Sequence, residues 1–461
     1  MLDETTLNTL YGDREAAMID DWFALLRIPS VSADPAHEAD CRHCAEVLTG
    51  LLTACGFHAD CLETGHKPLV FATRPGERPG PVTLVYGHYD VQPPDPLADW
   101  ESPPFEPAIR DGRCYARGAQ DNKGQLMYTI GALRALIETG VPLPPLKLCI
   151  EGEEENSSAG IAAAMRRDPD RFAAEALLVH DTNMAPSGEP AITMGLRGIV
   201  QLTATLHGAD HDLHSGMHGG LAPNPVQGLA QLLATLHNAD GYIAVDGYYD
   251  AVRPPSDTET RLAEAGPFDT AAYRAATGCL PVGGCANTSA ARRVGFLPSL
   301  DMNGVFGGYQ GPGVKTIIPA HATAKLSARL VPDQDPETCL SLIEQHLERH
   351  VPPGFRLAID ERGAVGPGFR LDPESPLVAA ARRALAPAGE PVQLRWEGAS
   401  IPIVSSLAQT AGATPLLVGF GLETDRIHAP NESFALDRFR QGFFYICRLM
   451  QALGTADGQT T

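Results

Sequence analysis

Histidine and carboxylate side chains stand directly after apolar segments of this 461-residue chain, or one loop beyond them. The side chains concerned belong to His88, Asp90, Glu153, Glu154, Glu155, Asp181 and His428, and Asp121 joins them from a glycine-flanked turn before a predicted helix. Open α/β sheets bind their ligands beyond the carboxyl ends of the parallel strands. If the apolar segments are strands of one such sheet, these side chains gather along one edge, where they could bind metal ions.

Carboxylates gathered at this density repel one another, and without a cation some of them would be forced to bind a proton. Two divalent cations would remove the conflict, because three carboxylates and a hydroxide would balance their charge. Paired metal ions about 3.5–4 Å apart commonly hydrolyse amides and phosphates. Each residue alone would more often be structural or on the surface, so the interpretation depends on their joint occurrence.

The elements that must position these residues can be read from the spacing of apolar side chains. Strands are predicted at 81–86, 146–150, 176–179 and 415–420, and helices at 14–28, 36–55, 126–138, 159–167 and 434–453. Alternation of strands and helices predicts an α/β fold with a mostly parallel sheet and helices on both faces. Such a sheet would bring the candidate residues to one edge.

The middle of the chain has a different pattern. Residues 199–206 and 322–330 alternate between apolar and polar types, like half-exposed strands. Helices are predicted at 225–236 and 336–350, and the polar stretch 240–290 is predicted to be rich in loops. This pattern predicts a separate α+β domain.

Length and pattern together predict two domains, because single hydrophobic cores stop growing at roughly 250–300 residues. A catalytic domain is expected to consist of 1–197 and 393–461. The α+β domain at 198–392 would be inserted between these two parts.

The composition argues against several classes of partner. The 35 Lys and Arg against 56 Asp and Glu give a net charge of −21. Binding to nucleic acid or to an anionic membrane is not expected, since both require a basic face. No run of roughly 18 apolar residues predicts a membrane-spanning helix, and the acidic start at Met1–Thr5 does not have the pattern of a secretory signal. We therefore expect a cytoplasmic protein.

The ten cysteines are scattered and too few for a disulfide scaffold at this length. One pair, Cys41 and Cys44, has the CxxC spacing of metal knuckles and redox sites. No second CxxC follows, and residues 39–52 are predicted to be an amphipathic helix. The pair is therefore interpreted as two reduced thiols on a helix face.

Several motifs resemble those of the di-metal aminoacylase/carboxypeptidase/dipeptidase family of metallopeptidases, most closely its carnosine-dipeptidase-like branch. The motifs are Gly87–Pro93, Arg117–Gly124, Glu151–Glu155, Asp212–Gly220, Ser327–Pro332 and Glu397–Pro402, in the order of the family. They extend over most of the chain. The resemblance implies a zinc-exopeptidase-like catalytic domain with an inserted lid and dimerisation domain.

The resemblance also implies a role for each candidate ligand. His88 and Asp181 would bind one metal ion, and Glu155 and His428 would bind the other. Asp121 would bridge the two ions, and the peptide bond after it would be cis. The two divalent ions are expected to be Zn²⁺, with Mn²⁺ or Co²⁺ as alternatives.

Three further residues take catalytic roles by the same resemblance. Asp90 would fix the orientation of the His88 ring. Glu154 would be the general base that moves a proton from water to the leaving amine, while the neighbouring Glu153 stands where relatives are often apolar. His214 would reach the active site of the partner subunit and stabilise the oxyanion.

The substrate carboxylate needs a cationic partner. Arg329 is the candidate, because a guanidinium pairs with a carboxylate through two hydrogen bonds. Ser400 could donate to the same carboxylate, and Thr316, at the end of a glycine-rich stretch, would lie near the ligand.

We therefore predict a di-metal exopeptidase, a metallo-dipeptidase that hydrolyses dipeptides or short peptides and forms a homodimer through the inserted domain. Carnosine-cleaving members carry a histidine in the stretch that corresponds to Asp372–Pro376, and none is present here, so carnosine is not the expected substrate. An N-acyl-amino-acid deacylase on the same scaffold is the alternative. A metal-stabilised binding protein without turnover is a third hypothesis.

Overall fold

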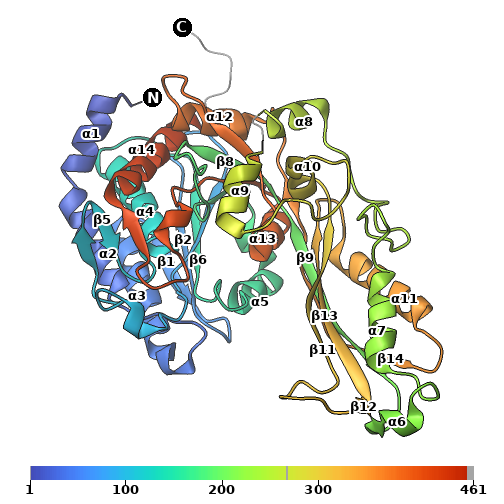
Figure 1. Cartoon of the computed structure of the whole chain (residues 1–461). Helices are drawn as coiled ribbons and strands as arrows, with labels where there is room; N and C mark the ends of the chain where they lie inside the picture. The colour runs from blue at the N-terminus through green and yellow to red at the C-terminus, as the bar shows by residue number, and fades with distance from the viewer. Residues whose placement is uncertain (1, 266–267, 454–461) are drawn as a thin grey trace. The chain divides into compact units, whose positions relative to one another are not determined.

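The protein is described by a computed structural model that covers residues 2–265 and 268–453. The chain forms two compact units (Figure 1). The described parts of 1–194, 371–395 and 406–461 make up the first unit, and those of 195–370 and 396–405 make up the second. Helix α12 (Pro376–Leu385), which the sequence analysis assigns to the insertion, packs against α14 (Leu436–Ala452) of the first unit.

The first unit is built on a mixed sheet with the strand order β1-β2-β6-β3-β7-β17-β8. Its strands are β1 (His58–Leu62), β2 (Leu69–Arg74), β6 (Leu146–Glu151), β3 (Thr83–His88), β7 (Ala176–Val179), β17 (Thr414–Leu417) and β8 (Ala191–Leu196). The central strands β6, β3, β7 and β17 run parallel, and the outer strands are antiparallel. All six residues of β3 are buried, as expected for a strand covered on both faces. The predicted α/β fold is confirmed.

Helices and short elements complete the first unit. They are α1 (Glu4–Gly12), α2 (Glu15–Leu26), α3 (Glu38–Ala54), α4 (Lys123–Glu138), α5 (Ala159–Arg167), η1 (Pro35–His37), η2 (Leu97–Asp99), η3 (Pro169–Phe172), η4 (Glu423–Asp425) and the small sheet of β4 (Ala108–Arg110), β5 (Arg113–Tyr115) and β18 (Ser433–Ala435). Helix α4 contacts α2, α14 and β3 and is buried along most of its length. Cys41 and Cys44 are buried on α3, as the helix interpretation predicts. Among the described residues no helix is both long enough and apolar enough to span a lipid bilayer.

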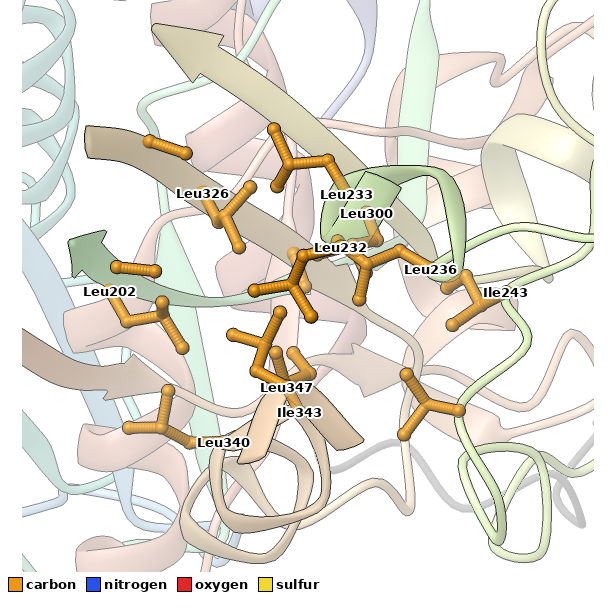
Figure 2. Close-up of a cluster of buried hydrophobic side chains, with 14 of the residues drawn as sticks. Leu202, Leu232, Leu233, Leu236, Ile243, Leu300, Leu326, Leu340, Ile343 and Leu347 are labelled. Carbon is orange, nitrogen blue, oxygen red and sulfur yellow. The ribbon is translucent and has the colours of Figure 1, made fainter. Parts of the chain in front are cut away.

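The second unit contains a four-stranded antiparallel sheet in the order β11-β13-β9-β14. The strands are β9 (Gly198–His207), β11 (Ser299–Gly307), β13 (His321–Leu330) and β14 (Arg356–Gly366). Helices α7 (Pro225–Ala234) and α11 (Pro336–His350) pack on this sheet (Figure 1). Alternate residues of β13 are buried, which confirms the predicted half-exposed strand. The buried side chains form the cluster shown in Figure 2.

Short elements occupy the rest of the second unit. They are β10 (Leu213–His214), α6 (Ser215–His218), α8 (Asp257–Ala263), α9 (Thr270–Thr277), α10 (Ala290–Gly295), β12 (Ile317–Ile318), β15 (Phe369–Arg370), and at its boundaries β16 (Gln393–Trp396) and α13 (Pro402–Ala411). Two of these helices, α8 and α9, fall in the stretch that the sequence analysis predicts to be loop-rich. Helix α8 begins with a capping box between Ser256 and Glu259. This capping box marks the start of a helix, whereas the apolar residues of α8 are too few to predict one.

Stability of the second unit should depend on the cluster in Figure 2. Leu232 is 0% exposed in this cluster, whereas Leu221 is 83% exposed. Leu232→Ala should lower the free energy of unfolding by about 2–5 kcal/mol, because the cavity left behind collapses only in part. Leu221→Ala should change it by less than about 0.5 kcal/mol. Urea denaturation of the full chain and hydrogen exchange of β13 measure the change in each variant. Equal destabilisation by Leu232→Ala and Leu221→Ala would contradict the packing described.

Candidate metal centre

Side chains from separate segments of the first unit form two groups that share one aspartate. His88 ends β3, Asp181 follows β7, Asp121 precedes α4, Glu155 follows β6, and His428 lies between η4 and β18. One group is His88, Asp121 and Asp181, and the other is Asp121, Glu155 and His428. Within each group the candidate ligand atoms lie within 4.8 Å of one another, so each group could hold a metal ion.

The two carboxylate oxygens of Asp121 face different histidines. His88 Nε2 is 3.2 Å from Asp121 Oδ1, and His428 Nε2 is 3.0 Å from Asp121 Oδ2. The second carboxylate of each group is close as well: Asp181 Oδ2 is 3.6 Å from His88 Nε2, and Glu155 Oε2 is 3.2 Å from His428 Nε2. This is the placement expected of an aspartate that bridges two cations.

The donor atoms fit a pair of divalent cations. His88 Nε2 is buried and has no hydrogen bond, so a ligand atom points into the group without a partner. Each group combines one imidazole nitrogen with carboxylate oxygens, the mixed donor set that suits Zn²⁺ and related ions.

Without bound cations, the carboxylates of this cluster carry an excess of negative charge. Burial and repulsion by neighbouring carboxylates raise the pKa of Glu154 to about 9. Burial and the charge of Asp121 also raise the pKa of Glu155. Burial would raise the pKa of Asp121 too, but the neighbouring rings of His428 and His88 outweigh this effect and lower it. The cluster therefore attracts protons, and bound cations would take their place.

Asp90 supports the centre in two ways. Its Oδ1 is 3.4 Å and its backbone oxygen 3.2 Å from Nδ1 of His88, the nitrogen on the far side of the ring from the cluster. Its carboxylate also accepts hydrogen bonds from the backbone N–H groups of Glu154 at 3.2 Å and Glu155 at 3.1 Å. The same side chain thus contacts the histidine ring and the turn that carries both glutamates.

The three consecutive glutamates have different surroundings. Glu153 Oε2 accepts the backbone N–H of Gly160 at 2.9 Å, at the start of α5, so this carboxylate is used by the fold. Glu155 belongs to the second group of candidate ligands, and Glu154 belongs to neither group. Glu154 is therefore the carboxylate of this turn that is neither a candidate ligand nor an acceptor of the α5 backbone.

Two amide side chains that the sequence analysis missed hold candidate ligands in place. Gln92 Nε2 donates to Glu155 Oε2 at 2.7 Å. Asn122 Nδ2 donates to Asp181 Oδ1 at 3.0 Å, and the peptide bond between Asp121 and Asn122 is cis, as the family resemblance implies. Both residues lie inside the motifs that carry the resemblance, and that position was the only signal available for them.

The second unit brings together two of the predicted substrate-binding residues. Arg329 lies on β13, and its Nη1 donates to Ser400 Oγ in the loop after β16. The guanidinium and the hydroxyl are thus adjacent donors, as binding of one carboxylate requires.

His214 and Thr316 also lie side by side in the second unit. His214 on β10 pairs with Ile317 on β12, and the backbone N–H of Ser215 donates to the Thr316 oxygen at 3.0 Å. The Nδ1 of the exposed His214 accepts the backbone N–H of Gly216 at 3.0 Å. The neutral ring therefore carries its proton on Nε2, which makes this nitrogen a hydrogen-bond donor.

Known proteins resemble this chain over almost its whole length. A model described as peptidase family M20/M25/M40 matches residues 84–452. The Cys-Gly metallodipeptidase DUG1 of Saccharomyces cerevisiae is 30% identical over 450 residues, which cover 92% of this chain and 93% of that protein. The Beta-Ala-His dipeptidase of Homo sapiens is 28% identical over 445 residues, covering 92% and 87%. The M20 family metallo-carboxypeptidase Sso-CP2 from Sulfolobus solfataricus has a solved structure with a TM-score of 0.81 and 28% identity, covering 94% of this chain and 98% of that one.

Metal binding should release protons and strengthen as the pH rises. Hydrogen bonds to Asp121 and Glu155 raise the pKa of His428 to about 10, so its ring is protonated at neutral pH in metal-free protein. A histidine must lose this proton to bind a metal ion. Calorimetric titration with Zn²⁺ in buffers of different ionisation enthalpy should show the release.

His428→Ala should reduce the number of protons released, whereas His58→Ala, on the exposed start of β1, should not. A binding enthalpy that is the same in every buffer would contradict the electrostatics described.

Proposed function

This chain belongs to peptidase family M20/M25/M40, and on that premise we propose that it is a metallo-dipeptidase that hydrolyses the amide bond of dipeptides or short peptides. The observation that carries the proposal is the pair of ligand groups that share Asp121. Relatives that align along nearly the whole chain are named as dipeptidases, which supports dipeptides as the substrate class.

Two divalent cations are proposed at this centre. His88 and Asp181 would hold one, Glu155 and His428 the other, and Asp121 would contact both. When bound, such cations polarise the amide carbonyl and lower the pKa of water. Zn²⁺ is proposed first because of the mixed donor set, and Mn²⁺ or Co²⁺ would suit the same ligands.

Glu154 is proposed as the general base. Its carboxylate is not among the candidate ligands, and the contact of Asp90 with its backbone N–H fixes the start of the side chain. Glu154 would accept a proton from the attacking water and deliver it to the leaving amine. Asp90 would act by holding the His88 ring and this turn.

The substrate's carboxylate would bind to Arg329 and Ser400, whose donor atoms are adjacent in the second unit. Thr316, which lies beside His214 in the second unit, would lie near the ligand together with that histidine. His214 would donate from Nε2 to the oxyanion that forms at the amide carbonyl, in the active site of a partner subunit. The second unit would then serve as lid and dimerisation domain, and the first as catalytic domain.

A homodimer through the second unit is supported by the edge of its sheet. Strand β11 is at the end of the sheet order, so one of its sides has no neighbouring strand among the described residues. Its side chains Met302, Val305 and Phe306 are between 42% and 56% exposed. Exposed apolar side chains on an unpaired edge are typical of a surface that pairs with another chain.

A reducing compartment, and hence the cytoplasm, is proposed as the location. All ten cysteines are free thiols in the structure, and most of them are buried. Disulfides are rare in proteins of the cytosol, where thiols are kept reduced.

Hydrolysis of a panel of substrates tests the proposal. Metal-stripped protein is assayed before and after Zn²⁺ or Mn²⁺ is restored, with unblocked dipeptides, N-acetyl amino acids and longer peptides. Metal-dependent cleavage of the dipeptides is expected. Cleavage of the N-acetyl compounds alone would instead assign the protein as an N-acyl-amino-acid deacylase, and metal binding without cleavage would leave a binding protein.

Glu154→Gln should keep both metal ions and reduce kcat by about 10²–10⁴-fold, because general acid–base catalysis contributes on that order. Glu153→Gln is the matched control, since its carboxylate accepts a backbone N–H of α5, and it should retain activity within a few-fold. Metal content and dipeptide turnover are measured on both variants. Loss of turnover in the Glu153 variant and not in the Glu154 variant would exchange the two assignments.

Catalysis across a dimer predicts complementation. His214→Ala alone should lower kcat by about 10²–10³-fold, the effect of removing one oxyanion donor. Mixing it with Glu154→Gln protein and allowing subunits to exchange should restore roughly a quarter of the wild-type activity, because half of the dimers are then hybrids with one intact site. Dimers should be present by light scattering, and no recovery in exchanged dimers would contradict the role of His214 in the partner subunit.

A further inference from the structure

Glu432 is a fully buried carboxylate that is bound by one short loop. Its Oε1 accepts the backbone N–H of Gln120 at 2.9 Å and that of Asp121 at 3.1 Å. Its Oε2 accepts the backbone N–H of Gly118 at 2.9 Å and Nη1 of Arg117 at 2.9 Å. The donors all come from the segment that ends at the shared aspartate.

The position of Glu432 in the chain adds a second connection. It follows His428 in the loop between η4 and β18, and His428 has a φ of 60°, in the left-handed region that is unfavourable for residues other than glycine. At the start of this loop, buried Asp425 accepts Nη2 of Arg113 and Nη1 of Arg438, both at 2.6 Å. The loop is therefore held at both ends, and at one of them by the Asp121 segment.

Packing alone does not require an anion at this place. A buried carboxylate is unfavourable unless its charge is paired and its oxygens accept hydrogen bonds, and apolar residues of similar volume often stabilise a protein equally well. Burial raises the pKa of Glu432, and Arg117 and the backbone N–H groups oppose that effect. Unlike an apolar residue, the Glu432 carboxylate accepts hydrogen bonds from several N–H groups at once and so fixes their positions.

The side chains that support the centre differ in which candidate ligand they contact. Gln92 contacts Glu155, which belongs to one group only. Glu432 binds the backbone N–H of Asp121, the residue common to both groups. A shift of the Asp121 backbone would displace both of its oxygens at the same time.

We propose that Glu432 is the positioning residue that couples the two metal sites, because it fixes Asp121 and the His428 loop to each other. The inference rests on the proposed di-metal function. It differs from a purely structural role, since it predicts that loss of this one carboxylate weakens both sites together.

The experiment measures Zn²⁺ binding to metal-free full-length protein, in competition with a chromophoric chelator, to give the number and affinity of the sites. In Glu432→Gln both affinities should fall about 10–100-fold, the usual effect of losing a side chain that orients ligands. In Gln92→Ala only one site should weaken. With Co²⁺ in place of Zn²⁺, the absorption bands of both sites should change in Glu432→Gln. The bands of only one site should change in Gln92→Ala.

Glu259→Gln is the control for a lost buried ion pair. Glu259 Oε1 is 3.1 Å from Nε of Arg370 in the second unit, and it contacts no candidate ligand. This variant should lower the unfolding midpoint and leave both Zn²⁺ affinities unchanged. If Glu432→Gln does not fold, Glu432→Asp keeps the charge beside Arg117 with a shorter reach, and both affinities should still fall.

Wild-type affinity at either site in the folded Glu432 variant would overturn the inference while leaving the proposed function intact. Loss of affinity in the Glu259 variant as well would also overturn it, because the effect would then be one of stability. Wild-type protein that binds fewer than two Zn²⁺ ions would overturn the proposed di-metal centre itself, and this inference with it.

Discussion

One buried carboxylate, Asp121, belongs to both groups of candidate ligands, and the rest of the first unit is arranged around it. Each of its oxygens faces one histidine, and a further carboxylate completes each group. Negative charges held this close in a buried place are stable only when protons or cations balance them. The raised pKa values of Glu154 and His428 are the sign of that imbalance in the protein alone.

Two kinds of structure satisfy this constraint: strands place the ligands, and hydrogen bonds around the ligands fix their orientation. The parallel strands β3, β6 and β7 bring their carboxyl ends to one edge, which places His88 and the 153–155 turn close together. Hydrogen bonds from neighbouring residues then fix the details: the backbone oxygen of Asp90 lies 3.2 Å from Nδ1 of His88, and Gln92 donates to Glu155. A metal site needs this second layer, because ligands displaced by even 1 Å bind poorly.

The strand ends could be predicted from the sequence because β3, β6 and β7 are mostly apolar, and the edge they share follows from general rules of parallel sheets. The supporting contacts could not be predicted in this way. Nothing in the spacing of Glu432 and Asp121 along the chain shows that the Glu432 carboxylate accepts the backbone N–H of Asp121. Helix α12 shows a second limit. Its amphipathic pattern reveals an apolar face but not which unit that face packs on.

The order of the ligands along the chain has a consequence for how the protein is made. His88, Asp121 and Asp181 all precede the second unit, whereas His428 follows it. A ribosome adds about 5–20 residues per second, so a nascent chain carries the first group of ligands for tens of seconds before the second group can be completed. A two-cation centre therefore cannot form until the chain has been translated past His428. A peptidase arranged in this way stays inactive while its second unit is being synthesised.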